Sequence, residues 1–482
     1  MADLKLLEGF PPKRKVLDKT WDEQAKDFTR TLNTLSDATW TKPINKRNIL
    51  DVLNPTTNTL PYLYALNAQA AHIGKDKSKA EEWLDYATVF LASFDPVQIR
   101  YADEQWRLLI DGTMSICSGL KIRDLTFLST AMLRLDPSGG TFTSNHLRLV
   151  RSSLELASPS QALPILDKDI YAFPQKPPKN VPDELINEES DFSNNFIIEN
   201  SGFAGKIKLE HVLEYYLLGA HVYIGVRNYS RARLFLEYLL LTPSPAHACS
   251  AFQMEAYKKW ILLGLLTEGR RFPLPRTNDQ QVLKSIRATS KAYEALAEDF
   301  EKRDYRKFGA EASLGFEVWQ DDGNMRLVKE VGDALFRFRV IDLQKTYAAL
   351  PVSRVATLLN LPGDAQQTLS DMIRAGQLNA SITPSSIGDA VLRFHPTSST
   401  ASSSQNDSLE AQTKRIENLV AFIKEADHRL RLSNEYVTYE RRSKRSGLGP
   451  DGDLAEQMDL TWDAPIAGTA GDDDGDEDIM AS

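Results

Sequence analysis

The stretch from residue 340 to residue 395 constrains the fold of this sequence more than any other stretch. Its apolar residues recur at helical spacing in three short segments, and two segments with strand character follow. The pattern predicts helices over 340–347, 354–359 and 364–375 and strands over 378–382 and 390–395. Pro384 and Gly388 lie between the strands and are typical of a turn. Three helices and a two-stranded hairpin predict a winged-helix module, and no strand is predicted before this hairpin.

A winged helix invites the hypothesis of DNA binding, and the charge of this module argues against it. Between residues 342 and 395 the basic and acidic residues balance, four against four: Lys345, Arg354, Arg374 and Arg393 against Asp342, Asp364, Asp371 and Asp389. Nucleic-acid affinity comes mainly from surplus cations that neutralise phosphates, and this module has no surplus. We therefore expect it to pack against protein and to bind no nucleic acid. An open edge of its strand pair could accept a strand from another chain.

The sequence before this module is almost continuously helical from residue 49 onward. Its clearest repeat places Tyr216, Ala220 and Tyr223 four and three residues apart on one helix, and Ala232 faces back from the next helix after a turn at Asn228. This spacing is typical of tetratricopeptide-like (TPR-like) repeats, which stack into a solenoid and offer surface rather than a catalytic pocket. A stretch rich in proline predicts a long surface loop at about residues 172–200.

A heptad pattern follows the winged-helix module. After a Ser-rich stretch that predicts a flexible linker, apolar residues recur every seven positions, with a second seam position between them: Leu409, Ile416, Leu419, Ile423 and Leu430. A helix with such a seam needs partner helices. Association with other chains is the preferred interpretation, and packing of this helix against its own solenoid is the alternative.

These patterns predict a mostly α-helical chain with six regions. They are N-terminal helical repeats over 1–207, a TPR-like helical part over 208–339, the winged-helix module over 340–395, a Ser-rich linker over 396–408, a C-terminal helix over 409–438, and a disordered tail over 439–482 that is first basic and then acidic. The longest apolar run, near Trp260–Leu266, is far shorter than the roughly 20 residues that cross a membrane, so no membrane association is expected.

The sequence carries no recognisable catalytic or metal-binding motif. Its seven histidines form neither HxH nor HExxH, and Cys117 and Cys249 form no CxxC pair. Gly202–Lys206 looks like a phosphate-binding loop but has two residues between its glycines, where that loop needs four. The net charge of −9 selects no class of partner. We therefore expect no enzyme activity, no cofactor and no metal.

Several segments match one protein family residue by residue. They are Tyr215–Gly219, Asn228–Ala232, Glu255–Leu262, Asp322–Lys329, in which Arg326 replaces a family glycine, and Met372–Ile382. These segments, and the order of helical repeats, neutral winged helix and helical tail, resemble the PCI family, which is shared by the proteasome lid, the COP9 signalosome and a translation initiation factor. The resemblance is to the COP9 signalosome branch and covers roughly residues 208–437. The linker and the acidic tail depart from the family pattern.

The resemblance implies a non-catalytic scaffold subunit of the COP9 signalosome, the complex that removes the ubiquitin-like protein Nedd8 from the cullins of cullin-RING ubiquitin ligases. In that complex the zinc isopeptidase is a different subunit with an HxH motif, which this sequence lacks. The resemblance also implies subunits 1 and 8 as neighbours, an indirect link to cullin-RING ligases, and residence in the cytoplasm and the nucleus.

The resemblance further implies two partner-binding surfaces. Winged helices of this family join edge to edge in an open ring, and C-terminal helices enter one bundle. The likeness places Ile382, Val391, Leu392 and Phe394 in or beside the ring strands, and Leu409, Ile416, Leu419, Ile423 and Leu430 in the bundle. Two alternatives stay open: a scaffold subunit of the proteasome lid, and a PCI protein of the RNA-export type that binds nucleic acid.

Overall fold

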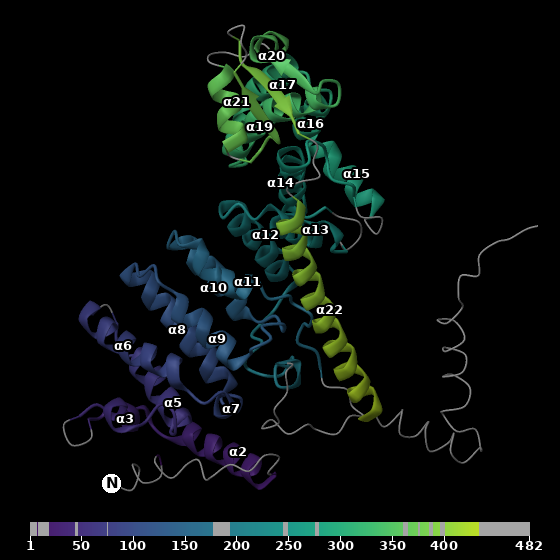
Figure 1. Ribbon diagram of the computed structural model, residues 1–482. Coiled ribbons are helices and arrows are strands. Elements are labelled where there is room, and N and C mark those ends of the chain that lie inside the picture. Colours follow the sequence, from purple (N-terminus) through teal and green to yellow (C-terminus); the bar gives the residue numbers. More distant parts are fainter. Residues whose placement is uncertain are drawn as a thin grey trace, which may run out of the picture. The chain divides into compact units, whose positions relative to one another are not determined.

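A computed structural model describes residues 7, 19–43, 47–74, 76–176, 193–243, 249–274, 279–359, 365–374, 376–384, 389–395 and 401–432 (Figure 1). The chain divides into two units, and each is described by itself. One unit comprises residues 1–176 and 184–401, and the other comprises residues 177–183 and 402–482. The described residues are mainly helical, and their three named strands form one sheet, so the predicted mostly α-helical fold is confirmed.

Helices α2 to α11 form the first part of the solenoid. Their bounds are α2 Lys19–Thr34, α3 Asp37–Thr41, α4 Ile49–Val52, α5 Thr59–Ala70, α6 Lys77–Ser93, α7 Pro96–Ile99, α8 Asp103–Leu120, α9 Thr126–Leu135, α10 Ser144–Glu155 and α11 Leu163–Leu166. Side-chain caps set helix starts: the Asp76 carboxylate accepts the Ser78 N–H at 3.1 Å at the start of α6. Inside the core between these helices, the Phe90 ring stacks on the Phe94 ring, and the Trp106 ring contacts Phe94 in a tilted arrangement.

Helices α12 to α19 continue the repeats. Their bounds are α12 Leu209–Gly225, α13 Tyr229–Leu241, α14 Ala251–Thr267, α15 Gln280–Thr289, α16 Lys291–Glu301, α17 Tyr305–Leu314, α18 Phe316–Asp321 and α19 Met325–Gln344. The predicted helix pair around Ala220 and Ala232 is α12 and α13, and Asn228 caps α13 as its turn residue. The two helices approach closely because Gly219 faces the Phe235 ring, to which a Cβ at position 219 would come within 2.6 Å.

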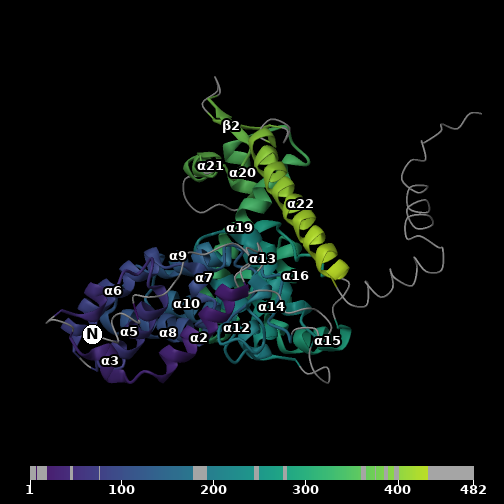
Figure 2. The ribbon, with the colours of Figure 1, turned by 90° about the horizontal axis from the view of Figure 1, so that it is seen from below.

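The winged-helix module contains a three-stranded sheet rather than the predicted two-stranded hairpin. Helices α20 (Val352–Leu359) and α21 (Ala365–Arg374) accompany strands β1 (Ala349–Pro351), β2 (Ala380–Thr383) and β3 (Val391–Phe394), in the sheet order β1-β3-β2. Figure 2 labels α20, α21 and β2 of this module. Both pairings are antiparallel, and Leu392 on β3 lies between Leu350 and Ile382. Sequence reasoning missed β1 because three residues ending in a proline carry too little local signal for a strand.

The prediction of a separate helix over 340–347 is wrong. Helix α19 continues unbroken to Gln344, because no proline or glycine lies between Gly332 and Gln344 to stop it. Its earlier turns, including Val331 and Leu335, pack in the core of the repeats, whereas Val340 packs in the core of the winged helix. The helix is therefore shared by both parts of this unit.

Helix α22 runs from Ala401 to Leu432 and so begins inside the stretch 396–408 that was predicted as a flexible linker. Residues 401–408 are helical because they contain no proline or glycine that would stop the heptad helix from extending toward its N-terminus. These predicted stretches lie outside the described residues: 177–192 of the loop, 385–388 of the turn between the predicted strands, 396–400 of the linker, 433–438 of the C-terminal helix, and the tail 439–482.

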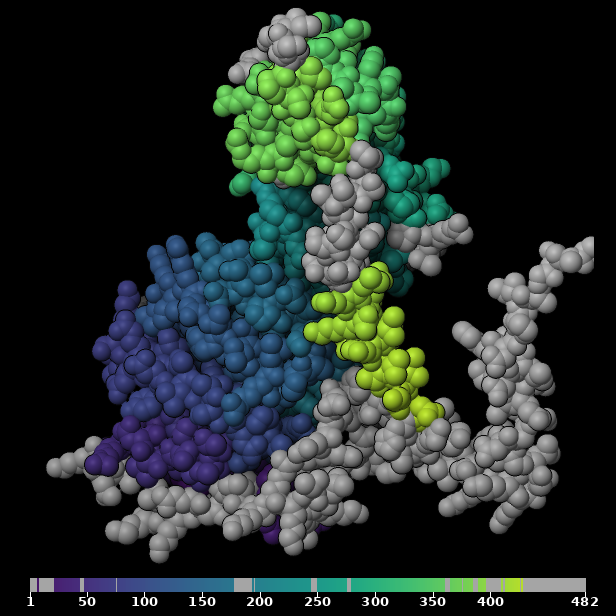
Figure 3. Space-filling model, in the orientation of Figure 1, coloured from purple at the N-terminus to yellow at the C-terminus, as the bar shows by residue number. Residues whose placement is uncertain are grey.

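Three apolar cores follow one another along the chain. The first is built mainly from α2 to α9, the second mainly from α12 to α19, and the third from the winged helix. In the space-filling view, the blue segments that include α6 to α10 form a continuous surface (Figure 3). Among the described residues, no helix combines the length and the apolar character that a membrane span requires.

Candidate assembly surface

One face of α22 exposes a row of large apolar side chains. Leu409 is 58% exposed, Ile416 is 61% exposed and Ile423 is 62% exposed, and Leu419 is also more than half exposed. Leu409, Ile416 and Ile423 are positions predicted from the seven-residue spacing, and Leu419 is the predicted second seam position. Leu430 occupies the next position, inside the helix, and its side chain lies outside the described residues. Figure 3 draws the described side chains of this helix in yellow-green.

Leaving this apolar row in water is energetically unfavourable for an isolated helix. Burying a Leu or Ile side chain contributes about 1.5–3 kcal/mol relative to leaving it in water, so four exposed side chains forgo a large stabilisation. Charged residues such as Lys414 and Glu417 lie off the row, which makes the helix amphipathic. An amphipathic helix of 32 residues, about 48 Å long, has the chemistry of a helix–helix seam.

The sheet places the four predicted wing residues in two environments. Ile382 and Val391 are half-buried, whereas Leu392 and Phe394 are buried in the core of the winged helix. Val391, Leu392 and Phe394 lie on β3, which is hydrogen-bonded to a strand on each side, and of the four only Ile382 lies on an edge strand. Contact of these four residues with a partner stays a prediction.

The open edges of the described sheet belong to β1 and β2. Strand β1 has three residues and ends in Pro351, which has no N–H to donate to a further strand. Strand β2 has four residues and no proline, and the Ser381 hydroxyl lies 2.9 Å from His395 Nε2 just past the end of β3. The edge of β2 is therefore the better candidate for pairing with a strand from another chain.

Ion-paired networks hold the helices of the repeats together. The Lys258 ammonium contacts the two Asp322 carboxylate oxygens at 2.7 and 2.8 Å. Glu255 lies 3.2 Å from His221 and 2.9 Å from Lys259, and the interactions with His221 and then Lys259 lower the pKa of Glu255 to about 2. These ion pairs link α12, α14 and the C-cap residue of α18, which indicates a structural role rather than a catalytic one.

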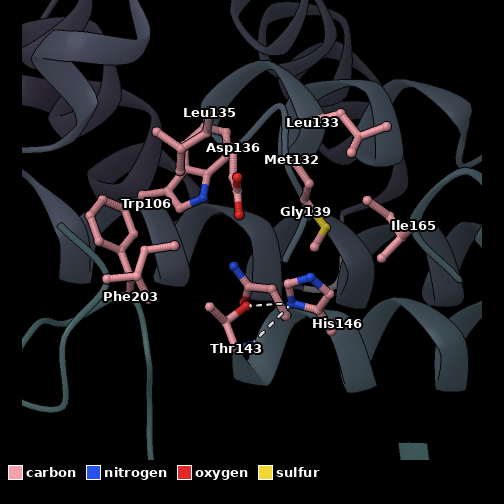
Figure 4. A pocket seen from close by; sticks show the side chains of 12 residues that line it. Trp106, Met132, Leu133, Leu135, Asp136, Gly139, Thr143, His146, Ile165 and Phe203 are labelled. Carbon is pink, nitrogen blue, oxygen red and sulfur yellow. Dashed lines mark hydrogen bonds between the residues drawn. The ribbon is translucent and has the colours of Figure 1, made fainter. Parts of the chain in front are cut away.

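A small cavity of about 30 Å³ lies within the N-terminal repeats (Figure 4). Asp136 and His146 are its titratable lining residues, and apolar side chains such as Trp106 and Phe203 surround them. Burial lowers the pKa of His146 to about 4, so the ring is neutral at pH 7. The cavity is too small for an organic substrate, because such sites usually measure about 300–1,000 Å³. Among the described residues, no cluster of side chains could hold a metal ion.

Two family models match this chain, one over most of the helical repeats and one over the last repeat helices and the winged helix. The model described as "COP9 signalosome complex subunit 3, N-terminal helical repeats" matches residues 22–282, which is more than half of the chain. The PCI domain model matches residues 312–386, from the end of α17 into the winged helix. The matches confirm the predicted PCI resemblance and extend it through the N-terminal repeats, where sequence reasoning found only helical character.

Three curated relatives named COP9 signalosome complex subunit 3 support the same family. The protein from Emericella nidulans is 30% identical over 395 residues, covering 79% of each chain. The protein from Neurospora crassa is 26% identical over 458 residues, covering 91% of each chain. The protein from Drosophila melanogaster is 26% identical over 341 residues, covering 70% of this chain and 73% of its own. This chain belongs to the COP9 signalosome subunit 3 family.

Proposed function

We propose that this chain is a non-catalytic scaffold subunit of the COP9 signalosome and that it supports the removal of Nedd8 from the cullins of cullin-RING ubiquitin ligases. The family and the names of the relatives support membership of that complex. The observation that carries the scaffold role is the exposed apolar row of α22, formed by Leu409, Ile416, Leu419 and Ile423. A row of this kind is what a subunit needs in order to enter a bundle with helices of other subunits.

The winged helix supplies the second proposed contact. Its β2 edge, which carries Ile382, can pair with a strand of a neighbouring winged helix through main-chain hydrogen bonds. Subunits 1 and 8 are the proposed neighbours, and cullin-RING ligases are indirect partners. The cytoplasm and the nucleus are the proposed compartments.

The described charges support protein rather than nucleic acid as the partner of the winged helix. Lys345 already pairs with Asp342 at 2.7 Å, and Arg374 pairs with Asp371 at 2.9 Å. Cations that are paired within the module contribute little to phosphate neutralisation, so the RNA-export alternative lacks the electrostatic surplus that it needs.

The first test is affinity purification of the tagged full chain from its native cells, with mass spectrometry of the proteins that accompany it. The proposal expects several PCI subunits and an HxH-bearing zinc isopeptidase in near-equal amounts. Proteasome-lid or RNA-export components in their place would overturn the assignment to the signalosome.

The second test changes the seam of α22. Ile423→Asp places a charge in the proposed bundle and is expected to reduce co-purification of the other subunits more than tenfold, which corresponds to about 1.4 kcal/mol or more. Ala421→Asp adds the same charge two residues away, at an exposed position off the seam, and is expected to leave co-purification unchanged. Equal behaviour of the two variants would contradict a role for the seam.

A further inference from the structure

The polar lining of the cavity in Figure 4 lies where two apolar cores meet. Trp106 and Phe203 belong to the first core, whereas the Phe142 ring, whose centroid lies 5.8 Å from that of His146, belongs to the second. Asp136, Thr143, Asn145 and His146 are all buried at this boundary. Burial of polar groups is unfavourable unless each of them finds a hydrogen-bond partner.

The hydrogen bonds of His146 fix the position of its proton. The Thr143 N–H donates to Nδ1 at 3.1 Å, and the Thr143 hydroxyl lies 2.8 Å from the same nitrogen. A nitrogen of neutral imidazole that accepts a hydrogen bond carries no proton, so the proton of this ring is on Nε2. Nε2 is therefore a buried donor. The Gly139 backbone lies near enough to the ring to favour its protonated form, but no described acceptor meets Nε2 in hydrogen-bond geometry.

Two acceptors border the same cavity without a described hydrogen-bond partner. Asp136 Oδ1 accepts the Ser138 hydroxyl at 2.5 Å, and Asp136 Oδ2 is left over. The side-chain oxygen Oδ1 of Asn145 is the second such atom. One donor and two acceptors thus surround a cavity of about 30 Å³, and roughly 10–15 Å³ is enough to hold one water molecule.

We propose that this cavity binds one water molecule, which accepts a hydrogen bond from His146 Nε2–H and donates to Asp136 Oδ2 and to Asn145 Oδ1. Water fits this set because it has two protons to donate and lone pairs to accept the third bond. A metal cation or an ammonium ion has no lone pair for the Nε2–H group, and an anion would meet the Asp136 carboxylate. The water joins the end of α9 to the first turn of α10 and so links the first core to the second.

A high-resolution crystal structure of the full chain tests the site directly. The expected result is a single ordered water within about 3.2 Å of His146 Nε2, Asp136 Oδ2 and Asn145 Oδ1. A dry cavity, or a direct hydrogen bond between His146 and Asp136, overturns the proposal. The location of the proton is checked in the same protein by nitrogen NMR of labelled histidine, where a protonated Nδ1 would contradict the proposed water geometry.

A double-mutant cycle tests the bridge in solution. Asp136→Ala and His146→Ala are each expected to lower the Tm by several degrees, and the double variant is expected to lower it by less than the sum, because either substitution alone already disrupts the water. Asp136→Ala combined with Gln253→Ala, a buried polar residue of α14, serves as the additive control. Additive behaviour of the first pair overturns the bridge. If an alanine variant does not fold, Asp136→Asn and His146→Gln, which keep the side-chain size, take its place.

Discussion

The apolar row of α22 and the polar cavity of the N-terminal repeats depart from the usual distribution of side chains in opposite directions. On α22, Leu409, Ile416 and Ile423 are exposed, whereas Asp136 and His146 are buried. The exposed row gains free energy only when another surface covers it, so it concerns assembly. The buried pair must be satisfied before the fold is stable, so it concerns folding. Substitutions in the two regions should therefore change different measurements.

The largest effect is expected from two charges in the row. Ile416→Asp combined with Ile423→Asp should lower the affinity for the other subunits on the order of 1,000-fold, because two burials of about 1.5–3 kcal/mol each are lost. The Tm of the isolated chain should stay unchanged. Sedimentation velocity with the remaining purified subunits measures the first quantity and calorimetry measures the second. A lowered Tm of the isolated chain would show instead that α22 packs on its own solenoid.

The next largest effect is expected from acid, through the buried pair. The pKa of His146 is about 4 in the folded chain against 6.5 for an unperturbed histidine, so between these values the unfolded chain takes up a proton that the folded chain does not. The contribution of His146 to the free energy of unfolding is therefore fully present above pH 6.5. It decreases as the pH drops toward 4, by roughly 3 kcal/mol in total at 1.36 kcal/mol per pH unit.

The measurement for this prediction is the Tm of the wild-type chain and of His146→Gln at several pH values across that window. Asp136, which borders the same cavity, is present in both proteins, so whatever it contributes is common to both curves. The wild-type Tm should fall more steeply than the Tm of the variant. Parallel curves would mean that His146 titrates normally.

The third prediction concerns a tight apolar contact inside the repeats, between Gly219 and the Phe235 ring. Gly219→Ala should destabilise the chain by about 1–3 kcal/mol, because the new Cβ would come within 2.6 Å of the Phe235 ring. Gly225→Ala at the end of the same helix has open space around the new Cβ and should be neutral or slightly stabilising. Urea unfolding of both variants measures the difference, and a similar loss in the two would contradict the tight fit.

The smallest effect is expected from a substitution of Lys345, a charged side chain that is exposed to solvent as most lysines are. The Lys345 side chain is 76% exposed and pairs with Asp342 one helical turn away. Lys345→Met should change the free energy of unfolding by less than about 0.5 kcal/mol and should leave co-purification intact. A clear loss of partners from this variant would reveal an electrostatic contact that the apolar row does not explain.

The elements that could be predicted from sequence are those with strong local signals. Asn228 marks the start of α13, and Gly376 has the positive φ of 67° expected of a glycine after a helix. The positions of the exposed row of α22 followed directly from the seven-residue spacing, although the helix begins earlier than expected. In each case the residues that decide the structure are neighbours along the chain.

The elements that could not be predicted depend on distant partners. Strand β1 exists because Leu350 pairs with Leu392, more than 40 positions later, and three residues cannot signal that pairing. The burial of Leu392 and Phe394 depends on the same pairing, since it makes β3 a central strand. The cavity around Asp136 and His146 is completed by Ile197 and Phe203, which come from a later segment of the chain. Motif spacing among the histidines could not reveal this arrangement.

Helix α19 gives the winged helix a mechanical connection to the repeats. A single rigid rod of 20 residues, about 30 Å long, is anchored at one end among the residues of the second core and at the other among those of the third. A rod clamped at both ends transmits torque, whereas a flexible hinge would absorb it. A force applied at the β2 edge should therefore be transmitted along α19 to the contact between α14 and α19 in the repeats.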